Sequence, residues 1–236
     1  METGGDDDWL DRILARFPGD DFPATGAFSS FARETLPDVS ALDDPDAALV
    51  AWMDREEMLF RTLERHHVQK QIDAGFKDVD HFVAVSLSVQ NRRKSRAGRA
   101  FEAHVETALH AHGLVFETGA RTEDNQKPDL LFPSSAAYGN ADWAADCLSM
   151  LGVKTSCKDR WRQVLAEARR VETKHLLTLE RPISVPQTDQ MAANRLQLVV
   201  SAPYVPAYTD AQQAWVWDVQ RFIGHVRAQQ SRCGVA

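Results

Sequence analysis

Lys127-Pro128-Asp129-Leu130-Leu131-Phe132 and Leu151-Gly152-Val153-Lys154 are the two stretches that decide the fold of this chain. Each contains a short apolar run, and the first run is entered through a proline, so both are predicted to be buried β-strands. Asp129 and Lys154 would then lie at the ends of neighbouring strands. The sheet would hold an acid and an amine close together.

The segment from Asp159 to Val171 is predicted to be a helix that follows the second strand. Its apolar residues recur at helical spacing, at Trp161, Val164, Leu165 and Ala168. Such a helix could bring Glu167 back over the two strand ends. Glu102, in the stretch from Ala100 to Leu109, is a fourth candidate for the same centre.

Two or three acids beside a lysine suit the hydrolysis of a phosphodiester. Carboxylates can hold Mg²⁺ against the phosphate, and a neighbouring lysine can steady or deprotonate the attacking water. Taken singly, an aspartate after a proline is more often part of a turn, and a glutamate on a helix is more often solvated. Only the order and joint spacing of these residues favour a catalytic site.

Longer motifs extend the pattern along the chain. They are Ser86-Leu87-Ser88-Val89-Gln90-Asn91-Arg92-Arg93-Lys94-Ser95-Arg96-Ala97-Gly98-Arg99, Phe101-Glu102, Lys127-Pro128-Asp129, Val153-Lys154-Thr155-Ser156-Cys157-Lys158-Asp159-Arg160-Trp161-Arg162-Gln163, and Pro186-Gln187-Thr188-Asp189. On these motifs the chain, from about Glu57 to Val226, resembles the EcoRII-like type II restriction endonucleases at their catalytic domain. The resemblance implies an α/β fold of the PD-(D/E)XK restriction-endonuclease type, with a central mixed β-sheet flanked by helices.

Nucleases of the PD-(D/E)XK superfamily normally carry their second acid two positions before the lysine. Gly152 occupies that position here and cannot bind a metal. The resemblance implies that Glu167 supplies the missing acid from the helix. Asp129 and Glu167 would then be the Mg²⁺ ligands, and Glu102 and Lys154 would complete the catalytic centre.

The resemblance further implies that Lys158, Asp159 and Arg160 read the CC:GG part of a DNA site in the major groove. A cationic side chain can donate to guanine O6 and N7, and an aspartate can accept from cytosine N4. Family members often carry arginine where this chain has Lys158, and lysine offers a point charge in place of a planar fork. The alternative is a solvated helix N-terminus, at which the helix dipole favours Asp159.

Five cations and no acid lie between Arg92 and Arg99, which predicts a basic loop that contacts DNA phosphates. A charge run of this kind can also serve solubility or an acidic partner. The predicted contacts to the DNA backbone or groove are Gln90, Asn91, Arg92, Arg93, Lys94 and Arg96. Relatives that flip a base would need a pocket, for which Trp52, Arg55 and Phe60 are candidates, although the aromatic residues could equally pack in a core.

Together these features predict a type II restriction endonuclease of a restriction-modification system, which hydrolyses double-stranded DNA with Mg²⁺. The site would be short and palindromic and would contain CC/GG, with CCWGG or CCNGG favoured. A palindrome favours a twofold homodimer, and the functional partner in the host would be a cognate DNA methyltransferase. Because only a short arm precedes the match, we expect no requirement for a second DNA site.

Two alternatives to this function stay open from the sequence. One is a structure-selective nuclease of the same fold that acts in repair or phage defence. The other is a catalytically inactive DNA-binding protein that kept the basic surfaces.

The chain has 236 residues, enough for one sizeable core. We expect an N-terminal arm and helical segment over residues 1–75, with dimer or DNA contacts, and a catalytic core over residues 76–236, packed as one compact domain. The net charge of −7 does not favour a simple nucleic-acid binder, but acids concentrate at Asp6 to Asp8 and Asp43 to Asp46 and leave the basic segments intact.

Three cysteines without a CxxC pattern predict a reducing cytoplasm and no structural zinc. The absence of a signal peptide and of an 18-residue apolar run predicts a protein without a membrane span.

The remaining pattern predicts helices over residues 47–72, 98–112, 142–150 and 211–229, and two strands over residues 175–179 and 196–201. Tyr138 follows the Asp129 strand, where it could approach a phosphate or pack in the core.

Overall fold

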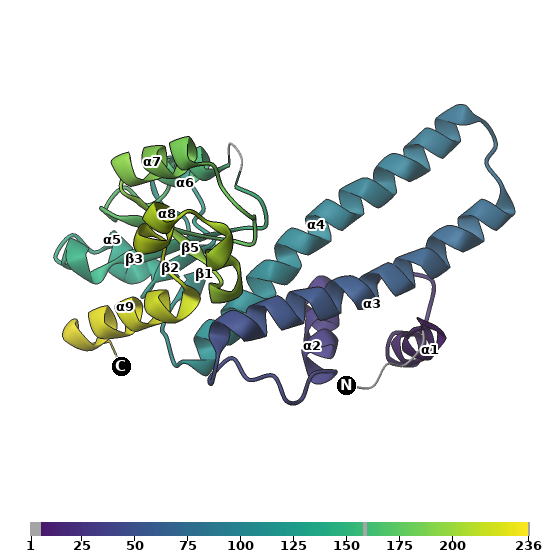
Figure 1. The fold of residues 1–236 in the computed structure, drawn as a ribbon, viewed down its shortest axis with the longest axis horizontal. Helices are drawn as coiled ribbons and strands as arrows, with labels where there is room; N and C mark the ends of the chain where they lie inside the picture. The colour runs from purple at the N-terminus through teal and green to yellow at the C-terminus, as the bar shows by residue number, and fades with distance from the viewer. Residues whose placement is uncertain (1–5, 158–159, 236) are drawn as a thin grey trace. The chain divides into compact units, whose positions relative to one another are not determined.

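The computed structural model describes residues 6–157 and 160–235 (Figure 1). They form two units, of which the first joins the chain up to Val39 with Ala51–His104. The second unit joins Ser40–Val50 with the chain from Val105 onward. The predicted boundary near residue 75 therefore falls inside the first unit, in the turn between two long helices.

The first unit is helical. Its helices are α1 (Asp6–Arg16), α2 (Thr25–Glu34), most of α3 (Pro45–Ala74) and the larger part of α4 (Val79–Ala111). The predicted helix over residues 47–72 is confirmed as α3. A core cluster forms where α1 and α2 meet α3, and its members are Trp9, Ile13, Phe28, Phe31, Ala32, Leu59, Phe60 and Leu63.

Helix α4 is longer than the sequence pattern predicted, because it runs unbroken through the cations that were expected to form a loop. The chain turns at Gly75, which has a positive φ of 77°, and Asp78 accepts the backbone N–H of His81 at 2.7 Å as α4 starts. Arginine, lysine and alanine all have high helix propensity. Positive charge alone therefore did not indicate a loop.

The second unit is built on a mixed sheet, as predicted. Among the described residues its strands lie in the order β1 (Glu117–Thr118), β2 (Leu130–Phe132), β3 (Ser149–Lys154), β4 (Lys174–Thr178) and β5 (Leu196–Val200). The first three strands pair antiparallel, and β3, β4 and β5 pair parallel. Residues 130 and 151 face each other in the register of β2 and β3.

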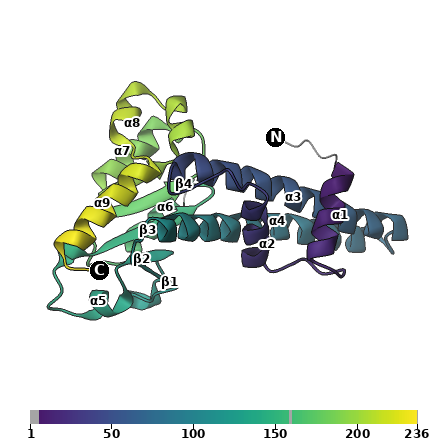
Figure 2. The same ribbon diagram turned by 90° about the horizontal axis from the view of Figure 1, so that it is seen from below.

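Helices cover both faces of this sheet. Leu131, Met150 and Leu176 point to one face and share a core with Trp161 and Val164 of α6 (Trp161–Ala166). On the other face, Phe132 and His175 contact Phe222 of α9 (Val219–Arg232), with ring centroids 5.8 and 5.1 Å apart. Figure 2 shows α9 running alongside the strands of the sheet. The remaining elements are η1 (Glu123–Asn125), α5 (Ser135–Gly139), η2 (Ala145–Cys147), α7 (Val185–Ala193), η3 (Ala202–Ala207) and α8 (Asp210–Trp215).

Two predicted helices are wrong. Residues 142–150 form the short turn η2 and the start of β3, because the run from Leu148 to Leu151 is buried as a strand. The predicted closing helix is divided into α8 and α9. It breaks because the backbone of Trp217 leaves the helical path and pairs with β5, exchanging hydrogen bonds with Leu198 and Val200 at 3.0 and 2.8 Å.

Asp46, at the start of α3, connects distant parts of the second unit. Its carboxylate accepts the backbone N–H groups of Ala202, Val219 and Gln220 at 2.8, 2.9 and 3.0 Å. The side chain is buried, and this burial raises its pKa despite the three hydrogen bonds. One carboxylate therefore satisfies two backbone groups at the N-terminus of α9 and one in η3.

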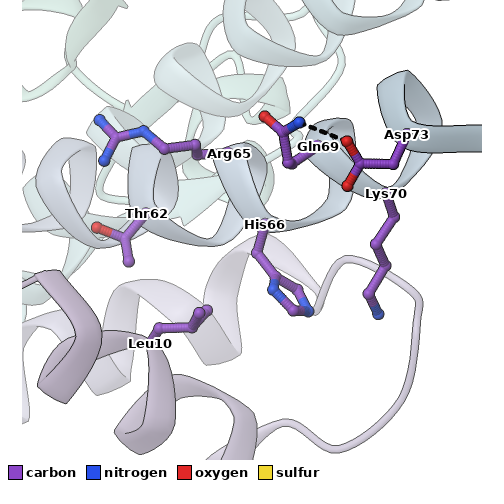
Figure 3. A pocket seen from close by; sticks show the side chains of 7 residues that line it. All are labelled: Leu10, Thr62, Arg65, His66, Gln69, Lys70 and Asp73. Atoms are coloured by element: carbon purple, nitrogen blue, oxygen red, sulfur yellow. Dashed lines mark hydrogen bonds between the residues drawn. The ribbon is translucent and has the colours of Figure 1, made fainter.

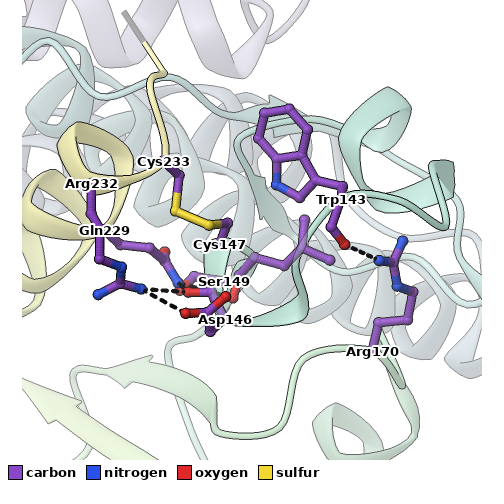
Figure 4. The surroundings of a disulfide bond; sticks show 9 residues. Trp143, Asp146, Cys147, Ser149, Arg170, Gln229, Arg232 and Cys233 are labelled. Atoms are coloured by element: carbon purple, nitrogen blue, oxygen red, sulfur yellow. Dashed lines mark hydrogen bonds and ion pairs between the residues drawn. A yellow bond between two sulfur atoms is a disulfide. The ribbon is translucent and has the colours of Figure 1, made fainter.

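A disulfide joins Cys147 of η2 to Cys233 after α9, whereas the cysteine count had predicted a reducing compartment (Figure 4). The bond closes a loop with a sequence separation of 86, for which the chain-entropy model gives a stabilisation of about 4.6 kcal/mol. Gln229 supports the same junction, because its amide donates to the carbonyls of Asp146 and Leu148 at 2.8 and 3.2 Å. Cys157 is free and buried. No described helix is long and apolar enough to cross a membrane.

Candidate active site

Asp129 and Lys154 meet at adjacent strand ends. Asp129 directly precedes β2, Lys154 ends β3, and the Nζ–Oδ2 distance is 2.5 Å. The same Asp129 oxygen accepts the backbone N–H of Val153 at 2.7 Å. Side chains alternate along a strand, so Lys154 shares a sheet face with Gly152, and this is the face that α6 covers. The two side chains are 16–17% exposed, which leaves the pair open on one side.

Glu167 lies immediately beyond α6. The helix ends at Ala166, and Glu167 itself has an extended backbone, so the prediction that this helix continues to Val171 is wrong. Glu167 is 8% exposed, and its Oε2 has no hydrogen-bond partner within the described part of the chain. A buried, unsatisfied carboxylate oxygen is uncommon, and its chemistry makes Glu167 a candidate ligand for a cation.

Electrostatic coupling connects Glu167 with the other two residues. Burial, and next the negative charge of Asp129, raise the pKa of Glu167 to about 7, while Lys154 and Lys174 act in the opposite direction. The structure thus brings Asp129, Lys154 and Glu167 together, although they are distant along the chain.

Packing explains why Gly152 stands where the superfamily has an acid. A Cβ atom built at Gly152 would lie 2.9 Å from Cγ2 of Val164 and 3.4 Å from its Cγ1. Val164 is fully buried on α6. The helix that delivers Glu167 therefore occupies the space that a side chain on β3 would need, and the two positions for the acid exclude each other.

The carboxylates of Asp129 and Glu167 form a donor set that fits a hard divalent cation. Mg²⁺ binds through one or two carboxylates and completes its octahedron with water and phosphate oxygens. No group of three or more His, Cys, Asp or Glu side chains arranged to hold a metal occurs within residues 6–157 and 160–235. The remaining ligands would accordingly come from solvent and from DNA.

The raised pKa of Glu167 predicts a pH dependence. A cation binds the ionised carboxylate, so we expect the affinity for Mg²⁺ to fall as the pH drops below about 7. The folding stability of the metal-free protein depends on pH in the opposite direction. Between pH 4.5 and about 7 the folded state keeps a proton on Glu167 that the unfolded state has lost, so the free energy of unfolding falls as the pH rises through this range. Metal titrations and urea denaturation across this range, compared with Glu167→Gln, measure both effects. An identical pH profile for the wild type and the variant would contradict the assignment.

The structure gives less information about the other residues predicted for catalysis and base reading. Glu102 lies on α4 in the first unit, and its predicted place beside Asp129 stays a prediction. Lys158 and Asp159 lie outside the described residues. Arg160 is exposed directly before α6, and its backbone N–H donates to the carbonyl of Cys157 at 2.6 Å. Glu180 tethers this connection by accepting from the hydroxyl of Ser156 at 3.3 Å and from the N–H of Cys157.

The predicted phosphate contacts on α4 differ in exposure. Gln90, Asn91, Arg93 and Lys94 are exposed, and Arg92 is half-buried with its guanidinium 4.3 Å from the ring centroid of Phe22. Arg93 forms an ion pair with Glu64 at 2.6 Å. Arg96 is buried between the rings of Phe28 and Phe60 and donates to the carbonyl of Pro23 at 2.7 Å. This burial argues against a phosphate contact for Arg96.

Lys94 and Arg96 should therefore respond differently to alanine substitution. We expect Lys94→Ala to weaken DNA binding and to lower the slope of log affinity against log salt by about one unit. Arg96→Ala should instead destabilise the first unit by about 1–3 kcal/mol, because it leaves buried polar partners unsatisfied. Binding titrations at several salt concentrations and urea denaturation separate the two. An unchanged salt slope for Lys94→Ala would remove it from the DNA interface.

The candidates for a base-flipping pocket lie in the interior of the first unit. Trp52 is 5% exposed beside His104, and Phe60 is 6% exposed and packs against Phe22 and Phe28. Arg55 donates to the hydroxyl of Thr35 at 3.4 Å. This is the core-packing alternative that the sequence left open, and the role in base flipping stays a prediction.

Sequence reasoning did not identify a polar cavity of about 350 Å³ between α1 and α3. Figure 3 shows its lining: Leu10 comes from α1, and Thr62, Arg65, His66, Gln69, Lys70 and Asp73 come from α3. The α3 residues follow the spacing of a solvated helix face, so no sequence signal distinguished them.

Comparisons with known proteins identify the family. The model of the family described as EcoRII C terminal matches residues 60–223. The chain is also 40% identical over 212 residues to the type II restriction enzyme EcoRII of Escherichia coli. That alignment covers 89% of this chain and 51% of EcoRII, so the chain spans about half the length of this relative. The chain belongs to the EcoRII C-terminal family.

Solved structures confirm the predicted fold. Metal-depleted Ecl18kI in complex with uncleaved, modified DNA superposes with a TM-score of 0.75 at 16% identity, covering 96% of this chain and 84% of that one. The restriction endonuclease PspGI in its substrate DNA complex gives a TM-score of 0.73 at 15% identity, covering 89% and 94% of the two chains. The fold is that of the PD-(D/E)XK restriction endonucleases.

Proposed function

We propose that this protein is a type II restriction endonuclease that hydrolyses phosphodiester bonds in double-stranded DNA with Mg²⁺. The observation that carries the proposal is the pairing of Asp129 with Lys154 at the ends of β2 and β3, together with Glu167, which is electrostatically coupled to Asp129 and has one buried oxygen without a hydrogen-bond partner among the described residues. Membership of the EcoRII C-terminal family supports it.

The residues of the site divide the chemistry between them. Asp129 and Glu167 would hold Mg²⁺, which supplies Lewis-acid stabilisation of the phosphate and a more acidic water when bound. Asp129 also holds the Lys154 ammonium at the strand end, where it can donate to a water or to a phosphate oxygen. Glu102 is proposed as the fourth member of the centre.

Recognition is proposed to follow the family pattern. Lys158, Asp159 and Arg160 would read a short palindromic site that contains CC/GG, with CCWGG or CCNGG favoured. Arg160 suits this role because it is exposed directly before α6, and Glu180 accepts the N–H of Cys157 three residues earlier. A homodimer would present two such segments to the palindrome. We further propose a cytoplasmic protein whose functional partner in the host is a cognate DNA methyltransferase.

Digestion of a defined plasmid tests this function. With Mg²⁺ we expect discrete fragments, and sequencing their ends should reveal one recurring CC/GG-containing sequence. A structure-selective nuclease would give no discrete pattern from relaxed duplex DNA. A protein that shifts DNA but never cleaves it with Mg²⁺ or Mn²⁺ would instead be the inactive DNA-binding alternative.

A further inference from the structure

Three consecutive backbone N–H groups directly after Glu167 are bound by side chains from a distant segment. The N–H of Ala168 donates to Oγ1 of Thr122 at 3.4 Å, and that of Arg169 donates to Oε2 of Glu123 at 3.4 Å. The N–H of Arg170 donates to the Tyr138 hydroxyl at 3.2 Å. Together the side chains of Thr122, Glu123 and Tyr138 form a clamp on this backbone.

Two members of the clamp are also tied to each other. The Tyr138 hydroxyl lies 2.6 Å from both carboxylate oxygens of Glu123 and donates to them. Tyr138 is 6% exposed, and burial raises its pKa to about 12, so the hydroxyl keeps its proton at neutral pH. Both oxygens of Glu123 face this hydroxyl, so the carboxylate and the phenol orient each other.

The backbone at the clamp adopts a conformation that a non-glycine residue rarely takes. Ala168 is fully buried and has a φ of 48°. The left-handed region costs a residue with a Cβ about 1–2 kcal/mol, and it persists only where the surroundings impose it. This turn at Ala168 follows the end of α6 by two residues and directly adjoins Glu167.

The side chain of Arg170 fixes the far end of the same segment. Its guanidinium donates to the carbonyl of Trp143 at 2.6 Å (Figure 4). It also donates to the carbonyl of Asn140 at 2.9 Å and contacts the carbonyl of Tyr138. Residues 168–170 are thus held in two ways: side chains bind their backbone N–H groups, and backbone carbonyls bind the guanidinium of Arg170. Glu167 is the residue between this anchored segment and α6.

We propose that the clamp positions the carboxylate of Glu167 against Asp129 and Lys154 for the cleavage reaction. Thr122 and Glu123 stand in the loop that leads to Asp129, and Tyr138 follows the strand that Asp129 begins. One continuous segment, residues 122–138, therefore supplies Asp129 and also locates Glu167. The inference rests on the proposed nuclease function, and it assigns positioning residues that touch neither substrate nor metal.

Tyr138→Phe tests the clamp, because it removes one hydroxyl and leaves the ring in place. We expect kcat to fall about 10- to 100-fold, since small misplacement of a reacting group has effects of that size, while KM for DNA stays unchanged. Ser149→Ala is the matched control: this serine is 2% exposed in the same unit, and its hydroxyl donates to Oε1 of Gln229 at 2.8 Å, at the end of β3 opposite Lys154. It should cost comparable stability in urea denaturation and leave kcat unchanged.

Substitutions at Glu123 test whether Glu123 and Tyr138 act together in positioning Glu167. Glu123→Gln can still accept from Arg169 and should keep most of the activity, whereas Glu123→Ala should resemble Tyr138→Phe. Combining Glu123→Ala with Tyr138→Phe should give little further loss of kcat. Equal losses of kcat in Tyr138→Phe and Ser149→Ala, or full activity in Tyr138→Phe, would overturn the proposal.

Mn²⁺ titration of the DNA-free protein separates this inference from the proposed function. Tyr138→Phe should bind Mn²⁺ more weakly than the wild type, because one of the two carboxylates is no longer held in place. If the wild-type protein fails to cleave any DNA, the nuclease proposal falls and the Mn²⁺ affinities still decide whether the clamp positions Glu167. Equal affinities in the wild type and the variant would refute the clamp.

Discussion

Replacing Asp129 by alanine is expected to lower the cleavage rate by at least about 10³-fold, comparable to the largest losses seen when one transition-state contact is removed. The substitution takes away the proposed metal ligand and the partner of Lys154 at 2.5 Å. It also frees the N–H of Val153, which should cost about 1–2 kcal/mol of stability. DNA binding supported by Ca²⁺ should persist, because Arg160 and α4 are unaffected. Single-turnover cleavage and gel-shift titrations measure the two properties separately.

Asp142→Ala provides the control for this experiment. Asp142 is an exposed acid in the same unit, placed after α5, and its removal should leave both cleavage and binding near the wild-type values. Robust cleavage by Asp129→Ala would show that the metal centre lies elsewhere.

Placing an acid at the position that the superfamily normally uses is expected to inactivate this protein. Gly152→Asp would introduce a Cβ atom 2.9 Å from Cγ2 of Val164, so α6 must move away from β3. Overpacking of this kind costs about 1–3 kcal/mol, and here it also displaces Glu167 from Asp129 and Lys154. We expect the loss of activity in cleavage assays to exceed what the loss of stability in urea denaturation explains.

Shortening Val164 tests whether the contact with Gly152 is the cause. Gly152→Ala should lose activity, and adding Val164→Ala should restore part of it, because the second change removes the methyl groups that the new Cβ would meet. We therefore expect Val164→Ala to raise kcat in the Gly152→Ala background, although the same substitution in the wild type would create a cavity. Gly152→Asp with wild-type activity would show that α6 has room to move without cost.

Local patterns in the sequence were sufficient for the two strands and for the pair formed by Asp129 and Lys154. Short apolar runs with a polar residue at the end fix both the burial and the direction of those side chains. The departure at Gly152 was equally visible. Its reason was not, because it depends on contact with Val164 of a helix whose position no local pattern determines.

The end of α6 could not be read from the sequence either. Apolar residues continue at helical spacing through Ala168, yet the helix stops before Glu167 because Thr122, Glu123 and Tyr138 bind the following N–H groups. Similarly, charge alone gave Arg96 a place on the surface. Its burial depends on Phe28 and Phe60, which lie far away in the sequence.

The three hydrogen bonds accepted by Asp46 determine which residues a stable fragment containing the second unit must include. The family model begins at residue 60, downstream of Asp46, so a fragment trimmed to residues 60–223 would leave the amides of Ala202, Val219 and Gln220 without their acceptor. Of these three, only Val219 is a buried residue, and leaving its amide without an acceptor costs about 1–3 kcal/mol, a sizeable fraction of the net stability of a typical domain. A transplantable version of the second unit therefore needs the stretch from Ser40 to Val50, even though that stretch contains none of the residues proposed for chemistry or recognition.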